Sequence, residues 1–121
     1  MNIAILGGGV AGVSSAIALK QKGFDVTVYE RNQSESNIGA GIVVWPNASY
    51  VLDQLGLLEE IKNVSGYPSA MQRISHTGDD LGSINIEEIN NCMGYPSLSI
   101  LRSDFQNILV SKLSFLNLGV R

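Results

Sequence analysis

An α/β fold that begins with a parallel strand-helix-strand unit is predicted by three observations at the start of the chain. The apolar run Ile3–Leu6 leads directly into three glycines, the pattern of a short buried strand that enters a tight turn. Residues 10–22 carry many small side chains that suit a helix lying close to a sheet, and Gly23 stands where helices commonly end. Residues 24–30 then alternate polar and apolar side chains, which predicts a second strand.

The turn between the first strand and the helix carries glycines at the Gly-x-Gly-x-x-Gly spacing. The first glycine allows the sharp turn, the second lets the backbone approach a pyrophosphate, and the third lets the helix pack on the strand without a Cβ. Unpaired N–H groups and the positive end of the helix dipole stabilise negative charge at the start of the helix. The motif therefore predicts a pyrophosphate site formed by Gly7, Gly9, Val10, Ala11 and Gly12.

Glu30 lies at the end of the second predicted strand, about 20 residues after the glycines, where an acid accepts hydrogen bonds from a ribose. A carboxylate at this position disfavours a 2′-phosphate. The predicted site therefore takes the ADP half of FAD or NAD in preference to NADP. A tight turn without a ligand is the structural alternative, and the strand, helix and acid around the motif argue against it.

The residues after Glu30 bear on the choice between FAD and NAD. In an NAD dehydrogenase the second strand is normally followed by another crossover helix and a third buried strand. Here residues 31–37 are polar and without period, and Gly39 to Gly41 then bend into the β-branched segment 42–44. We therefore expect FAD to bind more tightly than NAD.

The bulk properties exclude several classes of function. The 121 residues allow one domain, and a net charge of -3 without a cluster of Lys and Arg argues against nucleic acid as a partner. Cys92 is the single cysteine, so we expect no disulfide framework and a reduced, cytoplasmic setting. No apolar run approaches the length of a membrane span, no signal peptide precedes the first strand, and no metal site is predicted.

The middle of the chain contains short elements. Asn47 is a candidate N-cap for a helix that ends at Gly56, and a second short helix follows at residues 57–61. Residues 69–75 and 81–86 are predicted as a hairpin, and residues 87–97 as a polar loop.

The last part of the chain is predicted to contain a strand, a capped helix and the start of another strand. Residues 98–101 form the first strand, and Ser103 with Gln106 has the pattern of a capping box. The helix after it is amphipathic up to Leu116, and residues 118–121 begin the last strand.

These motifs, in this order, resemble the start of the FAD-dependent aromatic hydroxylases, the single-component flavoprotein monooxygenases of the para-hydroxybenzoate hydroxylase type. The resemblance rests on the glycine motif, Tyr29-Glu30-Arg31, Gly39-Ala40-Gly41-Ile42, Pro46-Asn47-Ala48 and the run 52–57. It covers nearly all of the chain. It implies a Rossmann-like FAD/NAD(P)-binding unit of the glutathione-reductase type, with an inserted small β-rich segment.

The resemblance also implies cofactors and site residues. FAD is the expected cofactor, NAD(P)H the transient reductant, O2 the cosubstrate, and a small aromatic molecule the substrate of the complete enzyme. Arg31, Gly41 and Arg102 join the cofactor-binding set, Arg102 because it resembles the family's arginine that precedes a helix and contacts the flavin nucleotide. No residue of this chain is predicted to be catalytic.

The family's chains continue well past the equivalent of residue 121, so the resemblance implies an incomplete sheet whose exposed edge allows self-association. Within residues 1–121 we expect a βαβ unit (1–30), an excursion with short helices and a hairpin (31–101), and a capped helix with the start of a strand (102–121). Two alternatives remain open: a fragment of an NAD- or FAD-dependent dehydrogenase or oxidase, and a non-catalytic dinucleotide-binding module.

Overall fold

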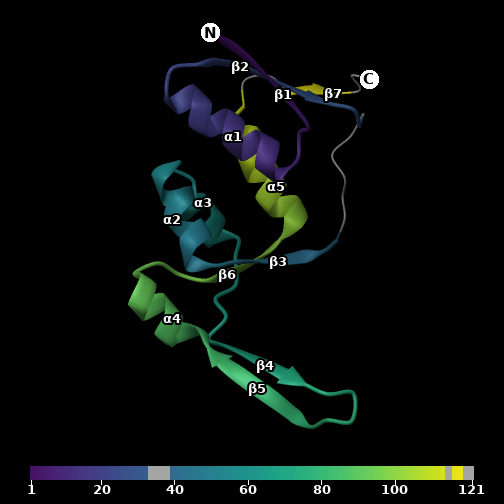
Figure 1. Cartoon of the computed structure of the whole chain (residues 1–121), viewed down its shortest axis with the longest axis vertical. Coiled ribbons are helices and arrows are strands. Elements are labelled where there is room, and N and C mark those ends of the chain that lie inside the picture. Colours follow the sequence, from purple (N-terminus) through teal and green to yellow (C-terminus); the bar gives the residue numbers. More distant parts are fainter. Residues whose placement is uncertain (33–38, 114–115, 119–121) are drawn as a thin grey trace. The chain divides into compact units, whose positions relative to one another are not determined.

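The computed structural model in Figure 1 describes residues 1–32, 39–113 and 116–118. It contains two compact units. The first unit comprises residues 1–40 and 101–121, and the second comprises residues 41–100. The first unit is thus assembled from both ends of the chain.

The first unit contains a parallel sheet with the strand order β1-β2-β7. Its elements are β1 (Asn2–Leu6), α1 (Val10–Gln21), β2 (Asp25–Glu30), α5 (Arg102–Ser111) and β7 (Leu116–Leu118). Ile3 pairs with Val26 in the β1–β2 register, and Val28 pairs with Leu116 in the β2–β7 register. The predicted strand-helix-strand unit is confirmed, and Gly23 with its φ of 84° follows the end of α1 as expected.

The core of this unit lies between α1 and one face of the sheet. Ala16 of α1 is buried against Val26 and Val28 of β2, and Ile3 and Leu113 pack partly against them. Figure 1 shows α1 and α5 side by side.

The first strand is less buried than the sequence predicts. Its isoleucines are half-buried, and Leu6 is 86% exposed. The reason is that, among the described strands, β1 lies at the edge of the sheet and packs on α1 with one face, whereas strands of parallel sheets are usually covered on both faces.

The second unit contains two small two-stranded sheets, β3–β6 and β4–β5, the latter antiparallel. Its elements are β3 (Gly41–Val44), α2 (Pro46–Gln54), α3 (Leu58–Asn63), β4 (Ala70–Ile74), β5 (Asp80–Asn85), α4 (Ile86–Met93) and β6 (Leu98–Leu101). The last residue of β6, Leu101, already belongs to the first unit. The predicted hairpin and the two short helices are confirmed. None of the described helices is both long and apolar enough to cross a bilayer.

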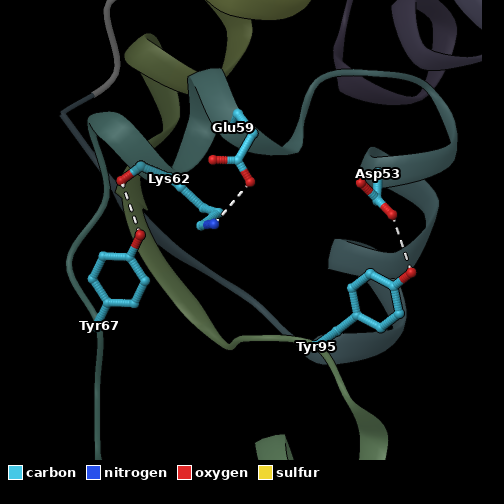
Figure 2. Close-up of polar contacts among 5 residues, drawn as sticks. All are labelled: Asp53, Glu59, Lys62, Tyr67 and Tyr95. Carbon is cyan, nitrogen blue, oxygen red and sulfur yellow. Dashed lines mark hydrogen bonds and ion pairs between the residues drawn. The ribbon is translucent and has the colours of Figure 1, made fainter.

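Side-chain hydrogen bonds join the loops of the second unit to its helices (Figure 2). The Tyr95 hydroxyl donates to Asp53 Oδ2 of α2 at 3.1 Å, and the Tyr67 hydroxyl donates to the Lys62 carbonyl at 3.4 Å. Lys62 also pairs with Glu59 at 2.8 Å within α3. The hydrogen bond to Asp53 and burial raise the pKa of Tyr95 above its ordinary value. These contacts hold the unit together locally.

The polar loop predicted at residues 87–97 is wrong, because α4 occupies residues 86–93. Asn85 caps this helix by accepting a hydrogen bond from the Glu88 amide at 3.2 Å, and Gly94 ends it with a φ of 74°. The apolar anchor is Ile86, which is buried. Because the other residues of α4 are mostly polar, the sequence shows no helical period there. The Asn85 cap and Gly94 are the sequence features that indicate this helix.

Three smaller predictions about helix ends are also wrong. The second helix begins at Pro46, with Trp45 and not Asn47 as its N-cap. The helix α5 begins at Arg102, its N-cap Leu101 makes no side-chain hydrogen bond, and Gln106 is engaged elsewhere. Leu116 lies in β7, because α5 ends at Ser111. The loop predicted at 31–37 and the strand predicted at 118–121 lie largely outside the described residues.

Candidate functional site

The glycine turn connects β1 to α1 and has the conformation that its sequence requires. Gly7 has a φ of 114°, a region that side chains with a Cβ rarely adopt, and its amide donates to the Tyr29 carbonyl of β2 at 2.7 Å. A Cβ at Gly12 would overlap the Gly7 carbonyl oxygen and lie 3.3 Å from Ile5 Cγ2. A Cβ at Gly9 would meet no atom within 4 Å. Gly12 is therefore needed for packing, whereas Gly9 borders open space.

The N-terminus of α1 presents donors without acceptors. The first backbone hydrogen bond of the helix runs from the Val13 amide to the Gly9 carbonyl at 2.9 Å. Within the described residues, the amides of Val10, Ala11 and Gly12 donate to no acceptor. Gly9 as N-cap offers no side-chain oxygen, and the first turn contains no acidic residue. An anion at this position would satisfy these donors and meet the positive end of the helix dipole.

Glu30 ends β2 beside the glycine turn, and backbone amides hold its carboxylate in place. Its Oε2 accepts from the Gly8 amide at 2.7 Å, and its Oε1 accepts from the Asn32 amide at 2.9 Å. The Asn32 and Gly8 hydrogen bonds keep the pKa of the Glu30 carboxyl below its ordinary value. Because an ionised carboxylate offers about four acceptor positions, more than these two amides occupy, it can also accept from a ribose hydroxyl.

Two predicted arginines also lie in the first unit. Arg31 follows Glu30 directly, is exposed, and lowers the pKa of that carboxyl by its charge. Arg102 is the first residue of α5, is exposed, and donates from its backbone amide to the Ala40 carbonyl at 2.9 Å. Within the part of the chain that the structure describes, neither guanidinium group forms an ion pair, so both can approach an anion.

Gln106 connects α5 to the glycine turn, a contact that the sequence did not predict. Its side-chain Nε2 donates to the Gly8 carbonyl. Arg102 lies four residues earlier and thus on the same face of α5. The structure therefore brings Arg102 to the side of α5 that meets the turn. Gln106 and Gly8 are 98 residues apart in the sequence, so no local pattern predicts their contact.

Gly41 is a predicted site residue that belongs to the second unit. It begins β3 in the second unit, where a Cβ would lie 4.0 Å from the Ile100 carbonyl oxygen. This spacing is ordinary van der Waals contact, so local packing alone does not require glycine there.

The set of donors and acceptors fits the ADP half of a dinucleotide. Open amides suit a pyrophosphate, the carboxylate of Glu30 suits ribose hydroxyls, and Arg31 and Arg102 supply positive charge in the same unit. Among the residues described, no cluster of three or more His, Cys, Asp and Glu side chains could hold a metal ion.

Comparison with known proteins defines the class. A family model described as FAD dependent oxidoreductase matches residues 2–88. The chain belongs to this family, whose cofactor is FAD.

Two curated relatives make the resemblance more specific. The FAD-dependent urate hydroxylase of Mycolicibacterium vanbaalenii is 35% identical over 111 residues, which cover 91% of this chain and 28% of that protein. The 6-hydroxynicotinate 3-monooxygenase of Pseudomonas fluorescens is 35% identical over 113 residues, which cover 92% of this chain and 29% of that protein. The predicted similarity to FAD-dependent aromatic hydroxylases is confirmed.

A solved structure agrees in fold. The crystal structure of Klebsiella pneumoniae HpxO complexed with FAD and uric acid matches with a TM-score of 0.83 at 26% identity, covering 100% of this chain and 31% of that one. The chain thus spans less than a third of the length of these relatives.

Proposed function

We propose that this chain is the FAD-binding portion of a flavin-dependent monooxygenase that hydroxylates a small aromatic or similar organic substrate with NAD(P)H and O2. The observation that carries the proposal is the open N-terminus of α1, with Glu30 held beside it by the Gly8 amide. Relatives of similar sequence are named as a urate hydroxylase and a hydroxynicotinate monooxygenase, which supports a small nitrogen-containing ring as substrate.

Each predicted residue has a role in this proposal. The amides of Gly9, Val10, Ala11 and Gly12 bind the pyrophosphate, and Gly7 makes the turn that aims them. Glu30 accepts hydrogen bonds from the adenosine ribose. Arg31 and Arg102 neutralise phosphate charge. Gly41, at the start of β3, stays in the proposed cofactor-binding set on the family resemblance alone.

The flavin, when bound, supplies the redox and oxygen chemistry. The contribution of this chain is to bind and orient the dinucleotide. Glu30 is ionised at neutral pH, as an ordinary glutamate is, and the Asn32 and Gly8 amides lower its pKa further. An ionised carboxylate is the better acceptor for hydroxyl groups. No proton transfer to substrate is assigned to residues 1–121.

Titration of the chain with FAD and, separately, with NAD tests the proposal. Quenching of flavin fluorescence measures the first, and calorimetry measures both. We expect saturable FAD binding that ADP displaces, and weaker binding of NAD. An NAD-dependent dehydrogenase predicts the reverse order, and absence of any FAD or ADP binding would contradict the proposal.

An assay of NADH and NADPH oxidation in the presence of FAD separates the enzyme from a non-catalytic dinucleotide-binding module. We expect no turnover by the 121 residues alone, because relatives are more than three times as long. Turnover supplied by a longer version of the protein that contains this chain would favour the enzyme.

Two further proposals concern the surroundings of the protein. The single cysteine, which is free and exposed, supports a reducing, cytoplasmic location, and fractionation of cells tests it. In the described sheet β1 has one unpaired edge, which supports self-association through that edge. Sedimentation over a range of concentrations tests this second proposal.

A further inference from the structure

The peptide groups on both sides of Gly8 are held by side chains. The Gly8 amide donates to Glu30 Oε2 at 2.7 Å, and the Gly8 carbonyl accepts from Gln106 Nε2. The two partners lie 22 and 98 residues away in the sequence, on β2 and α5. Both contacts are partly buried. The centre of the glycine turn is therefore fixed from two different elements.

This double contact matters because three consecutive glycines have unusual backbone freedom. Glycine loses more conformational entropy on folding than any other residue, so an unsupported turn of this kind would sample many conformations. The Gly8 carbonyl shares a planar peptide group with the Gly9 amide. A hydrogen bond that fixes the carbonyl therefore also fixes the direction of the Gly9 N–H.

From this geometry we propose that Gln106 is a positioning residue for the dinucleotide, which keeps the Gly9 amide correctly oriented and holds α5, with Arg102, against the phosphate-binding turn. The inference rests on the proposed function for the identity of the ligand. The contact itself is a property of the first unit without any ligand. Gln106 acts through Gly8 and needs no contact with the cofactor.

The spacing of Arg102 and Gln106 strengthens this assignment. Residues four apart on a helix share one face, about one helical turn from each other. Because Gln106 meets the Gly8 carbonyl, Arg102 lies one turn closer to the N-terminus of α5 on the same face. Loss of the Gln106 contact would loosen both the turn and the placement of this guanidinium.

The variant Gln106→Met tests the proposal, because methionine matches glutamine in length and helix propensity but has no donor. The matched control is Asn107→Ala, which removes an amide from the neighbouring exposed position of α5. Two readouts are needed: the amide nitrogen chemical shift of Gly9 by NMR without ligand, and the dissociation constant of ADP by calorimetry. Thermal melting checks that both variants fold.

We expect Gln106→Met to shift the Gly9 nitrogen resonance and to weaken ADP binding roughly 3- to 10-fold, the effect of one ordinary hydrogen bond. Asn107→Ala should leave both unchanged. A Met variant with an unchanged Gly9 resonance would show that the contact is absent. A shifted resonance with unchanged ADP affinity would overturn the positioning role. Failure of the unmutated chain to bind ADP would instead contradict the proposed function and, with it, the ligand assigned to Gln106.

Discussion

Adding one methyl group at either of two glycines should separate the folding role of the turn from its binding role. In Gly12→Ala the new Cβ would overlap the Gly7 carbonyl oxygen, and it would lie 3.1 Å from the Gly7 carbonyl carbon. The atoms in the way belong to the backbone of a turn whose Gly7 amide is bonded to β2 at 2.7 Å. The turn therefore cannot move aside without losing that hydrogen bond.

Two opposing effects decide the size of the change at Gly12. Alanine is favoured over glycine inside a helix by about 1 kcal/mol, whereas overpacking costs about 1 to 3 kcal/mol. Because backbone atoms and not a flexible side chain are in the way, we take the upper end of the overpacking cost. The net loss is then about 2 kcal/mol, which lowers the melting temperature by roughly 6 to 10 °C for a chain of this size.

Gly9→Ala is the control for this experiment. Gly9 has a φ of -74°, which alanine adopts readily, and its Cβ would meet no atom within 4 Å. We expect a melting temperature within about 2 °C of the unmutated chain, since substitutions without new contacts usually change stability by less than 0.5 kcal/mol. FAD affinity should nevertheless fall by roughly tenfold or more, because the methyl group would stand where the pyrophosphate approaches the backbone.

Circular dichroism melts and FAD titrations on the three proteins measure both effects. The reasoning about close packing would be refuted if Gly12→Ala melted at or above the temperature of the unmutated chain. A Gly9→Ala variant that bound FAD with unchanged affinity would refute the position assigned to the pyrophosphate.

Three further predictions concern Glu30 and the cap of α4. Glu30→Ala should weaken FAD binding by roughly tenfold or more in the same titration, because ribose hydroxyls lose a charged acceptor; equal affinities would remove the ribose-binding role. In the unmutated chain, the Asn32 and Gly8 amides lower the pKa of the Glu30 carboxyl. The ionised carboxylate therefore stabilises the folded state above about pH 4.3, the ordinary glutamate pKa, and this stabilisation is lost as the pH falls through the lower pKa of the folded state. Carbon NMR titration of the carboxyl should give a midpoint below that ordinary pKa, and an ordinary midpoint would contradict these contacts. Asn85→Ala removes the acceptor of the Glu88 amide and should destabilise α4 by about 1 kcal/mol in a denaturant melt, an effect that Asn85→Ser, which can still cap, should largely avoid.

The structure also changes the expected consequence of losing Glu30. By its position alone, Glu30 ends a strand beside a polar segment, where a substitution has little packing to disturb. The carboxylate is in fact bonded to the Gly8 amide inside the glycine turn. Glu30→Ala should therefore loosen the turn as well as remove the ribose acceptor, and hydrogen exchange at Gly8 would detect the loosening.

The amino-acid sequence by itself determined the βαβ unit and singled out the residues that we propose bind the dinucleotide. These features depend on local signals: an apolar run of strand length, glycines at fixed spacing, and an acid at the end of the second strand. Each acts over one or two elements, so periodicity and spacing are enough to find it. Local signals failed where they were weak or ambiguous, as for α4, whose single buried apolar residue Ile86 carries no visible period.

Only the tertiary structure decided how the end of the chain contributes to the same site. Ser103 and Gln106 have the pattern of a capping box, yet Gln106 donates to the Gly8 carbonyl, and the helix begins at Arg102 without a side-chain cap. A capping box would use the Gln106 side-chain oxygen as an acceptor, whereas the contact with Gly8 uses the side-chain nitrogen as a donor, and the sequence signals only the near contact. The choice depends on the packing of α5 beside α1 and on β7 joining β2, contacts between segments far apart in the chain that no local pattern records.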